Sequence, residues 1–124
     1  MIKTGILLGC FFALTTVILG AFGAHALKDQ LSIYGKSIYE KGIFYQMFHS
    51  FGILFISVIQ HSISNLELSV SIWLFSIGII LFSGSLYVLA LTNIKWLGAI
   101  TPIGGALFLI GWAIVFYKTL NLNI

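Results

Sequence analysis

The chain has 124 residues, of which 60% are hydrophobic and only 7% are charged, and its mean hydropathy is +1.11. A water-soluble domain carries about a quarter charged residues because its surface must be solvated, so this composition excludes an ordinary soluble domain and predicts that most of the chain contacts lipid. The six lysines outnumber the three acidic residues, but they are scattered along the chain, which argues against a nucleic-acid surface.

Four apolar segments are each long enough to cross a bilayer, which takes about 20 residues at about 1.5 Å per residue. They cover approximately residues 5–27, 42–60, 68–91 and 96–117. The connections between the later segments are short, so successive helices are expected to be antiparallel neighbours. The sequence therefore predicts an all-α fold and a multi-pass membrane protein. Residues 1–124 are expected to form one domain, which is an antiparallel bundle of four transmembrane helices.

The first segment ends in GAFGAHALK, residues 20–28, which has two interpretations. Small residues after an apolar run are typical of a signal-peptide cleavage site, but the apolar region of a signal peptide covers only about 7–15 residues. Small residues also recur every three or four positions along the whole segment, which is typical of a membrane helix that packs closely against another helix. We therefore expect a retained helix. The expected packing stripe consists of Gly5, Gly9, Ala13, Thr16, Gly20 and Ala24.

The longest connection is KDQLSIYGKSIYEK, residues 28–41, which holds five of the nine charges. Leu31, Tyr34 and Ile38 are spaced as on one face of a helix, so the segment is expected to lie in the plane of the membrane interface. Its tyrosines suit the level of the lipid headgroups, where an aromatic ring has one wet end.

The lysines predict an orientation in the membrane. In a four-span protein the first and third connections share one side, which holds four lysines, while the side of the termini holds two. Lysine is enriched on the cytoplasmic side, so both termini are expected outside the cytoplasm. The four are Lys28, Lys36, Lys41 and Lys95, and the two are Lys3 and Lys118.

The second apolar segment contains YQMFHS, residues 45–50, in which Gln46, His49 and Ser50 share one face of a helix. Polar groups in hydrocarbon are costly and generally face the bundle interior. An antiparallel helix pair would bring His49 within reach of His25, near the end of the first segment. Two interpretations stay open: these residues bind a haem, a quinone or an amphipathic compound or relay protons, or they lock the bundle by hydrogen bonds. A metal site is disfavoured because no cysteine or carboxylate is placed to complete the ligand shell.

The third segment carries Ser76, Ser83 and Tyr87 near helical spacing, with Ser85 off that face. We expect these side chains to pack between helices and to hydrogen-bond backbone carbonyls.

The fourth segment opens with LGAITPIGG, residues 97–105, which contains the only proline. Either Thr101 caps a helix that begins at Pro102, or the helix begins near Trp96 and kinks at Pro102, which frees a backbone carbonyl that a ligand can use. Close packing of the nearby glycines is the preferred interpretation. These glycines are Gly98, Gly104 and Gly105.

Common catalytic motifs are absent. The sequence has no phosphate-binding loop, nucleophile elbow or zinc-protease motif, and Asp29, Glu40 and Glu67 all belong to connections or segment ends. We therefore expect that the protein is not an enzyme.

Four motifs, in order along nearly the whole chain, resemble the bacterial domain-of-unknown-function 423 family, to which the animal transmembrane protein 256 group is similar. They are GAFGAHALK (20–28), YQMFHS (45–50), SGSLYVLALT (83–92) and ITPIGGALFLIGW (100–112). The resemblance implies a small membrane protein with four helices, but no agreed biochemical activity. The family pattern often continues the second motif as His-Ala-Leu-Ala, whereas this chain has His49-Ser50-Phe51-Gly52. The family positions to watch map to His25, Gln46, His49, Tyr87, Thr101 and Pro102.

Three functional hypotheses follow from the sequence. The first is a non-enzymatic protein of the cell (plasma) membrane that acts in membrane integrity or homeostasis by packing with lipids, with itself or with a membrane-protein partner. The second is a site for a quinone, haem or amphipathic compound near His25, Gln46 and His49, between the first two helices and the start of the fourth. The third is a small transporter, which would need several copies because four helices rarely enclose a wide aqueous path. No cofactor can be named from the sequence.

Overall fold

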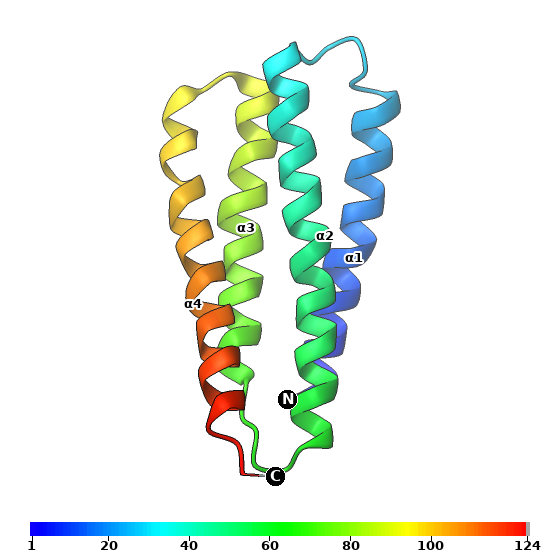
Figure 1. Ribbon diagram of the computed structural model, residues 1–124. Helices are drawn as coiled ribbons and strands as arrows, with labels where there is room; N and C mark the ends of the chain where they lie inside the picture. Colours follow the sequence, from blue (N-terminus) through cyan, green and yellow to red (C-terminus); the bar gives the residue numbers. More distant parts are fainter. Residues whose placement is uncertain (124) are drawn as a thin grey trace.

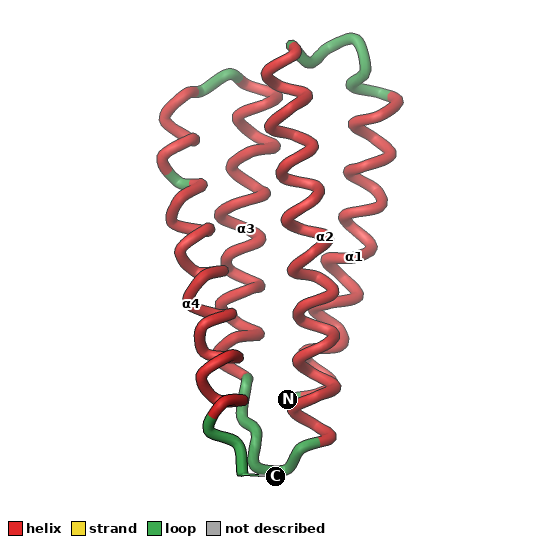
Figure 2. Tube along the Cα trace, viewed as in Figure 1, coloured by secondary structure: helices red, strands yellow, loops and turns green. Residues whose placement is uncertain are grey.

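The computed structural model describes residues 1–123, which form four long α-helices (Figure 1). They are α1 (Ile2–His25), α2 (Ile33–Ser62), α3 (Ser69–Thr92) and α4 (Thr101–Leu120), and a short 3₁₀-helix, η1 (Lys95–Ala99), precedes α4. With η1 counted as part of the last span, all four are long and apolar enough to cross a membrane. Figure 2 shows no strand among residues 1–123. The predicted all-α class and the four spans are confirmed.

The helices run antiparallel, and both termini lie at the same end of the molecule as the connection between α2 and α3 (Figure 1). Extensive contacts join α1 to α2, α2 to α3 and α3 to α4. The helices α2 and α3 form an inner pair that is more buried than α1 and α4. The outer helices therefore leave much of their surface to lipid.

The start of α2 differs from the prediction. Ser32 caps the helix by accepting a hydrogen bond from the Gly35 N–H at 2.9 Å, so residues 33–41 form its first turns and are not a separate segment in the interface plane. A helix of 30 residues is about 45 Å long, whereas the hydrocarbon core is about 30 Å thick. The charged first turns of α2 therefore extend beyond the hydrocarbon, and residue 42 marks the start of its apolar part only.

The start of α4 also differs from both sequence-based alternatives. The N-cap residue is Ile100, and no side chain caps the helix. Pro102 occupies the first turn, where its missing N–H leaves no hydrogen bond unmade, and the separate 3₁₀-helix η1 replaces the kinked helix that begins near Trp96. The ends of α1 and α3 lie within three residues of the predicted ends.

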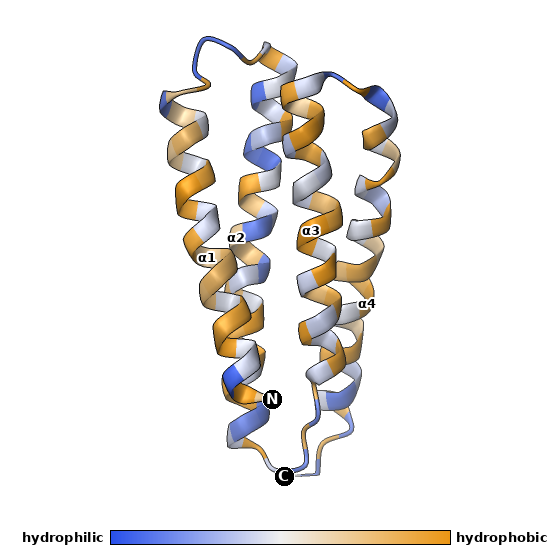
Figure 3. Cartoon of the chain, turned by 180° about the vertical axis from the view of Figure 1, so that it is seen from behind, coloured by the Kyte–Doolittle hydropathy of each residue, from blue (hydrophilic) through white to orange (hydrophobic). Residues whose placement is uncertain are grey.

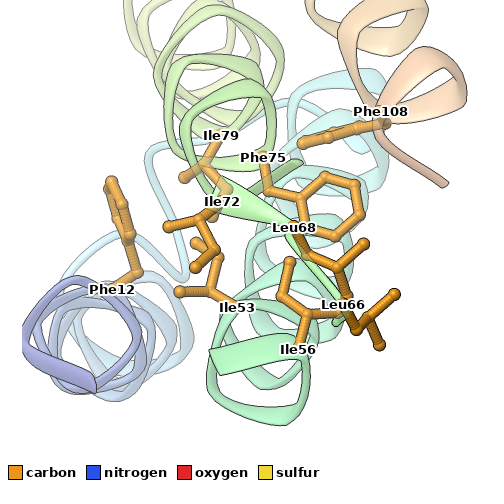
Figure 4. Close-up of a cluster of buried hydrophobic side chains, with 9 residues drawn as sticks. All are labelled: Phe12, Ile53, Ile56, Leu66, Leu68, Ile72, Phe75, Ile79 and Phe108. Atoms are coloured by element: carbon orange, nitrogen blue, oxygen red, sulfur yellow. The ribbon is translucent and has the colours of Figure 1, made fainter. Parts of the chain in front are cut away.

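The core consists of two clusters of buried apolar side chains. Figure 4 shows the first cluster, to which all four helices and the α2–α3 connection contribute. The second lies towards the opposite end of the bundle, around the α3–η1 connection. Because lipid tails are as apolar as these side chains, close packing and interhelical hydrogen bonds decide how the helices associate. The first cluster is Phe12, Ile53, Ile56, Leu66, Leu68, Ile72, Phe75, Ile79 and Phe108, and the second is Leu27, Ile38, Tyr39, Leu86, Tyr87, Leu89, Ala90 and Leu97.

The outer faces of the helices are apolar. Hydrophilic residues concentrate at the two ends of the molecule, with a further polar patch along α2 (Figure 3). Large apolar side chains are exposed along the length of the helices, among them Leu7, Val17, Phe51, Leu109 and Phe116. Such a surface fits the hydrocarbon of a bilayer.

Candidate functional site

The most connected polar group in the membrane interior is the side-chain amide of Gln46. Its Nε2 donates to the Phe12 carbonyl at 3.0 Å and to the Thr15 hydroxyl at 2.8 Å. Its Oε1 accepts a hydrogen bond from the Tyr87 hydroxyl at 2.8 Å. One buried side chain of α2 thus links α1 and α3, and we call Thr15, Gln46 and Tyr87 the amide network.

Local sequence places the amide network between the helices. Gly42 lies one turn before Gln46, and a Cβ at Gly42 would stand 2.6 Å from the Tyr87 ring, so glycine lets that ring lie against α2. Ser83, one turn before Tyr87, donates to the Gly42 carbonyl at 2.7 Å. Ser50 lies on the same face of α2 and returns its hydroxyl to the Gln46 carbonyl at 2.5 Å, which satisfies it within its own helix.

His49 takes part in a different contact, with α4. Its Nε2 accepts a hydrogen bond from the Trp112 indole N–H at 3.1 Å, and its Nδ1 lies 2.8 Å from the Tyr45 carbonyl. The imidazole is stacked on the ring of Phe108, with ring centroids 3.5 Å apart and planes 8° apart. We call His49, Phe108 and Trp112 the aromatic contact.

The partners of His49 determine its tautomer. The Trp112 indole is a donor only and the Tyr45 carbonyl is an acceptor only. Nε2 must therefore accept while Nδ1 carries the proton, which is the neutral Nδ1–H form. A second proton on Nε2 would place two N–H donors face to face. Ligation of a haem iron or a metal through Nε2 would first require displacement of Trp112.

The expected pairing of His25 with His49 does not form. His25 is the exposed last residue of α1, whereas His49 is buried and points towards α4. Because α2 begins at Ile33, His49 lies in the middle of that helix and not near its start. Gln46 and His49 also differ by about 60° around α2, since successive residues turn by about 100°, and this angle directs them to different neighbours.

Two of the other predicted residues, Ser85 and Thr101, serve the contact between α3 and α4. The hydroxyls of Ser85 and Thr101 lie 2.6 Å apart, so Ser85 faces the bundle although the spacing placed it off the polar face. Ser76 donates to the Ile72 carbonyl at 2.8 Å within its own helix. Pro102 is exposed. Thr101 and Pro102 therefore do not join His25 and Gln46 in one site.

The small-residue stripe of α1 packs closely at Gly5 and Gly9 and stays at least half-buried as far as Thr16. A Cβ at Gly5 would overlap the Ser57 side chain, and one at Gly9 would stand 2.5 Å from Leu54 Cγ. Farther along, Ala13 is half-buried, the nearest atom to a Cβ at Gly20 would be 3.9 Å away, and Ala24 is exposed. The end of the stripe, Gly20 and Ala24, lines a groove instead, because α1 and α2 leave a space there of about 430 Å³.

The glycines before and within α4 behave differently from one another. A Cβ at Gly104 would stand 2.8 Å from the backbone Cα of Phe82, so the chains of α3 and α4 meet there. At Gly105 the nearest atoms are an ordinary 3.7 Å away, and Gly98 is exposed with Leu89 at 3.9 Å. The prediction of close packing holds for Gly104 alone.

A second groove runs between α2 and α4 and measures about 620 Å³. Its walls are mainly aromatic, with Phe44, Phe48 and Phe108 among them, and both polar partners of the aromatic contact border it. This size falls within the range of small-molecule sites, which is about 300–1,000 Å³.

Metal-binding residues do not gather in this structure. Among residues 1–123, no three histidine, cysteine or acidic side chains come close enough to hold a metal ion. All buried side-chain nitrogen and oxygen atoms of these residues have hydrogen-bond partners. In the described part of the chain, the membrane interior thus presents satisfied polar contacts, and a groove lies on either side of α2.

The sequence interpretation missed Thr15 and Trp112. Thr15 had no distinguishing signal, because a threonine on a membrane helix generally bonds its own backbone, as Thr15 also does to Phe11. Trp112 was not singled out, because a tryptophan in a membrane protein is typical of an interface anchor or of packing. The signal that points to it is its place in the middle of α4, where an indole N–H needs an acceptor.

Comparison with known proteins identifies relatives of the chain. Residues 19–105 match the model of a family described as "Protein of unknown function (DUF423)". A UPF0382 membrane protein of Staphylococcus epidermidis is 50% identical over 119 residues, which are 96% of this chain and 97% of the relative. A UPF0382 membrane protein of Staphylococcus aureus is 48% identical over 117 residues, 94% and 95% of the two chains. UPF0382 membrane protein YwdK of Bacillus subtilis is 40% identical over 114 residues, 91% and 93% of the two chains. No solved structure matches the chain.

Proposed function

Because this chain belongs to the DUF423 family, as its four motifs indicated, and its relatives are named membrane proteins, we propose that it supports the integrity or homeostasis of the plasma membrane without catalysis. It does so by packing against lipids and against other membrane helices. One observation carries the proposal: the buried polar side chains of the described residues are all paired within the protein.

The hydrogen bonds of Gln46 and His49 decide which surface of the protein is free to act. Gln46 and His49 are the polar residues of the spans best suited to bind a ligand or to catalyse a reaction. Every hydrogen-bonding side-chain atom of both residues is engaged within the protein. A general acid, general base or nucleophile needs an atom that can reach a substrate. The surface that remains is the apolar outer face of the helices, which interacts with acyl chains and with apolar faces of other proteins.

A deletion strain of the natural host tests this proposal. We expect the strain to show altered permeability to a small dye and altered order of its membrane lipids. Both should be restored by the wild-type gene and not by an unrelated four-span protein produced at the same level. An unchanged membrane would contradict the proposal, as would turnover of a defined substrate by the purified protein.

The α2–α4 groove supports a second candidate function, the binding of a flat amphipathic compound such as a quinone. Its aromatic walls offer stacking surfaces, and the His49–Trp112 pair supplies a polar edge. A quinone carbonyl would have to replace His49 as the acceptor for the indole N–H.

Lipid extracts of the protein purified from native membranes test this candidate. A bound quinone should be present in wild type and lost in Ala106→Leu, which narrows the groove without touching the aromatic contact. His25→Ala is the matched control because His25 lies outside this groove, and it should retain the compound. Equal recovery from wild type and Ala106→Leu would contradict the candidate.

A transporter is less well supported. Several copies would have to surround an aqueous path, and their contact faces would come from outer helix surfaces that are rich in large apolar side chains. Such surfaces also suit a homo-oligomer or a complex with another membrane protein, which sedimentation in a mild detergent would detect.

A further inference from the structure

The groove between α1 and α2 is held open by Tyr39. Its ring lies against Gly23, where a side chain would overlap it, and its hydroxyl donates to the Leu19 carbonyl at 2.5 Å. The ring thus acts as a fixed spacer at the floor of the groove. On the α1 side, Gly20 and Ala24 leave the space of about 430 Å³ unfilled.

The outer end of this groove carries positive charge. Lys28, in the connection after α1, and Lys36, in the second turn of α2, both line it and are exposed. Glu40 also lines it, so the two ammonium groups exceed the one carboxylate. This end lies where α2 leaves the hydrocarbon, which is the level of the lipid phosphates.

The inner end of the groove is apolar and enters the hydrocarbon. Its α2 wall runs from Lys36 through Ile43 and Phe44 to Met47. The eleven steps of helix from Lys36 to Met47 rise by about 16 Å, which takes the groove from the headgroup level into the hydrocarbon. A ligand that fits both ends must carry a negative group at the headgroup level and an apolar chain that extends into the hydrocarbon.

We infer that this groove binds one anionic phospholipid. The phosphate lies between Lys28 and Lys36, and one acyl chain follows α2 past Phe44 to Met47, over the small residues Gly20 and Ala24 of α1. The inference rests on the proposed function, in that the protein acts through lipid contacts, and it names the lipid class and the place. It also explains why the small-residue stripe continues past the part of α1 that packs against α2.

Native mass spectrometry of the protein from vesicles of phosphatidylcholine mixed with phosphatidylglycerol tests the inference. Wild type should retain one phosphatidylglycerol in preference to phosphatidylcholine. Lys28→Gln with Lys36→Gln should lower this preference by about 25-fold, since each lysine near an anionic headgroup contributes about fivefold. The matched control is Lys41→Gln with Lys95→Gln, which removes the same charge at the same end of the molecule but outside the groove. It should leave the preference within about twofold of wild type.

A further variant tests the acyl-chain part. Ala24→Leu fills the groove from an exposed position, so the fold should be retained, as judged from its helical circular dichroism, while retention of phosphatidylglycerol should fall about tenfold. Undiminished retention in Ala24→Leu would overturn the inference, as would equal losses in the two lysine pairs or no preference in wild type. These outcomes are separate from the deletion strain, whose membrane can change whether or not this groove selects a lipid.

Discussion

The amide of Gln46 shows what holds this protein together at the scale of one residue. In water, a free amide hydrogen-bonds to solvent, whereas in hydrocarbon each unsatisfied polar group costs several kcal/mol. Gln46 meets this requirement with partners on α1 and α3, so the helices are tied to one another at one depth. The same bonds that satisfy the amide therefore define how α1, α2 and α3 are aligned.

Replacement of Gln46 by leucine tests the amide network. The Tyr87 hydroxyl loses its acceptor and the Thr15 hydroxyl loses its donor, while the Phe12 carbonyl keeps the Thr16 hydroxyl as a donor. We therefore expect a loss of about 1–3 kcal/mol in the free energy of unfolding. Unfolding in mixed micelles of sodium dodecyl sulfate and a mild detergent would measure it. Tyr87→Phe removes only one of these bonds and keeps the ring, so it should cost less. If Tyr87→Phe lowered the free energy of unfolding as much as Gln46→Leu or more, Gln46 would not be the centre of the amide network.

The tautomer of His49 is a second prediction for a single residue. The donor-only indole of Trp112 and the acceptor-only carbonyl of Tyr45 require the neutral Nδ1–H form. Nitrogen-15 solid-state NMR in bilayers should show one protonated Nδ1 and one unprotonated Nε2. Trp112→Phe keeps an aromatic ring but removes the N–H donor, and the variant should show a mixture of tautomers. A protonated Nε2 in wild type would contradict the aromatic contact.

The polarity of Gln46 and His49 was enough to predict that both face the interior, but their partners could not be predicted. The partner of each residue depends on how α2 is rotated about its axis relative to its neighbours. The separation of three residues between Gln46 and His49 does not determine that rotation. Gln46 meets α1 and α3, and His49 meets α4. The prediction that His25 and His49 lie close together was wrong for this reason. It was also wrong because the middle of α2 could not be located before the true start of the helix was known.

At the scale of the elements, glycines set how closely α3 and α4 approach. Gly104 faces the backbone of Phe82, and across the same contact Gly78 faces the ring of Phe108. Such small residues allow close approach and dispersion contacts between helices where lipid provides no hydrophobic drive. The contact also carries the hydrogen bond from Ser71 to the Gly111 carbonyl at 3.0 Å.

Gly104→Ala tests this contact. The added methyl group would stand 2.8 Å from Phe82 Cα, an atom of the backbone that cannot turn away, so α4 must shift and stability should fall by about 1–3 kcal/mol. The matched control is Gly84→Ala in α3, where no atom lies within 4 Å of the added group. This control should be neutral or stabilising by up to about 1 kcal/mol. Thermal unfolding in detergent would compare them, and equal melting temperatures would contradict the assigned contact.

Glu67 makes the start of α3 sensitive to acid. Its carboxylate accepts a hydrogen bond from the Ser69 N–H at 2.7 Å, and the bonds from Ser69 lower the pKa of Glu67. Because the pKa is lowered in the folded state, the carboxylate stabilises the fold when the pH is above the ordinary pKa of glutamate. This stability is lost as the pH falls through the lowered pKa. Wild type should therefore lose stability on acidification. Glu67→Gln should lose less, as thermal unfolding across an acidic pH series would measure, and parallel curves would contradict this role.

Apolar length predicted the number of spans well because hydrocarbon thickness imposes it. It could not predict where helices begin and end outside the hydrocarbon. Helix α2 continues through Lys36, Glu40 and Lys41 because charged side chains are compatible with a helix that projects into the headgroups. Their charges locate the membrane boundary, whereas the cap at Ser32 locates the helix start.

At the scale of the whole molecule, the inner pair α2 and α3 supports two outer helices. This arrangement leaves a groove between α1 and α2 near the first connection and another between α2 and α4. The end of the α1 stripe, Gly20 and Ala24, and the aromatic wall of α4 therefore face lipid-accessible space. Spacing alone could not separate a stripe that packs from a stripe that lines a groove, because both need small side chains.

The orientation of the molecule is the last prediction. The first connection and η1 lie at one end, and the termini lie with the second connection at the other (Figure 1). One end therefore carries four lysines and the other end carries Lys3 and Lys118, and the positive-inside rule assigns the end with four to the cytoplasm. Alkaline phosphatase, which is active only outside the cytoplasm, should be active when fused to the C-terminus, and green fluorescent protein at the same position should stay dark. Replacement of Lys28, Lys36 and Lys41 by glutamine should give a mixture of orientations. A fluorescent C-terminal fusion of wild type would reverse the prediction, and it would also move the lysine-lined groove from the cytoplasmic leaflet to the outer one.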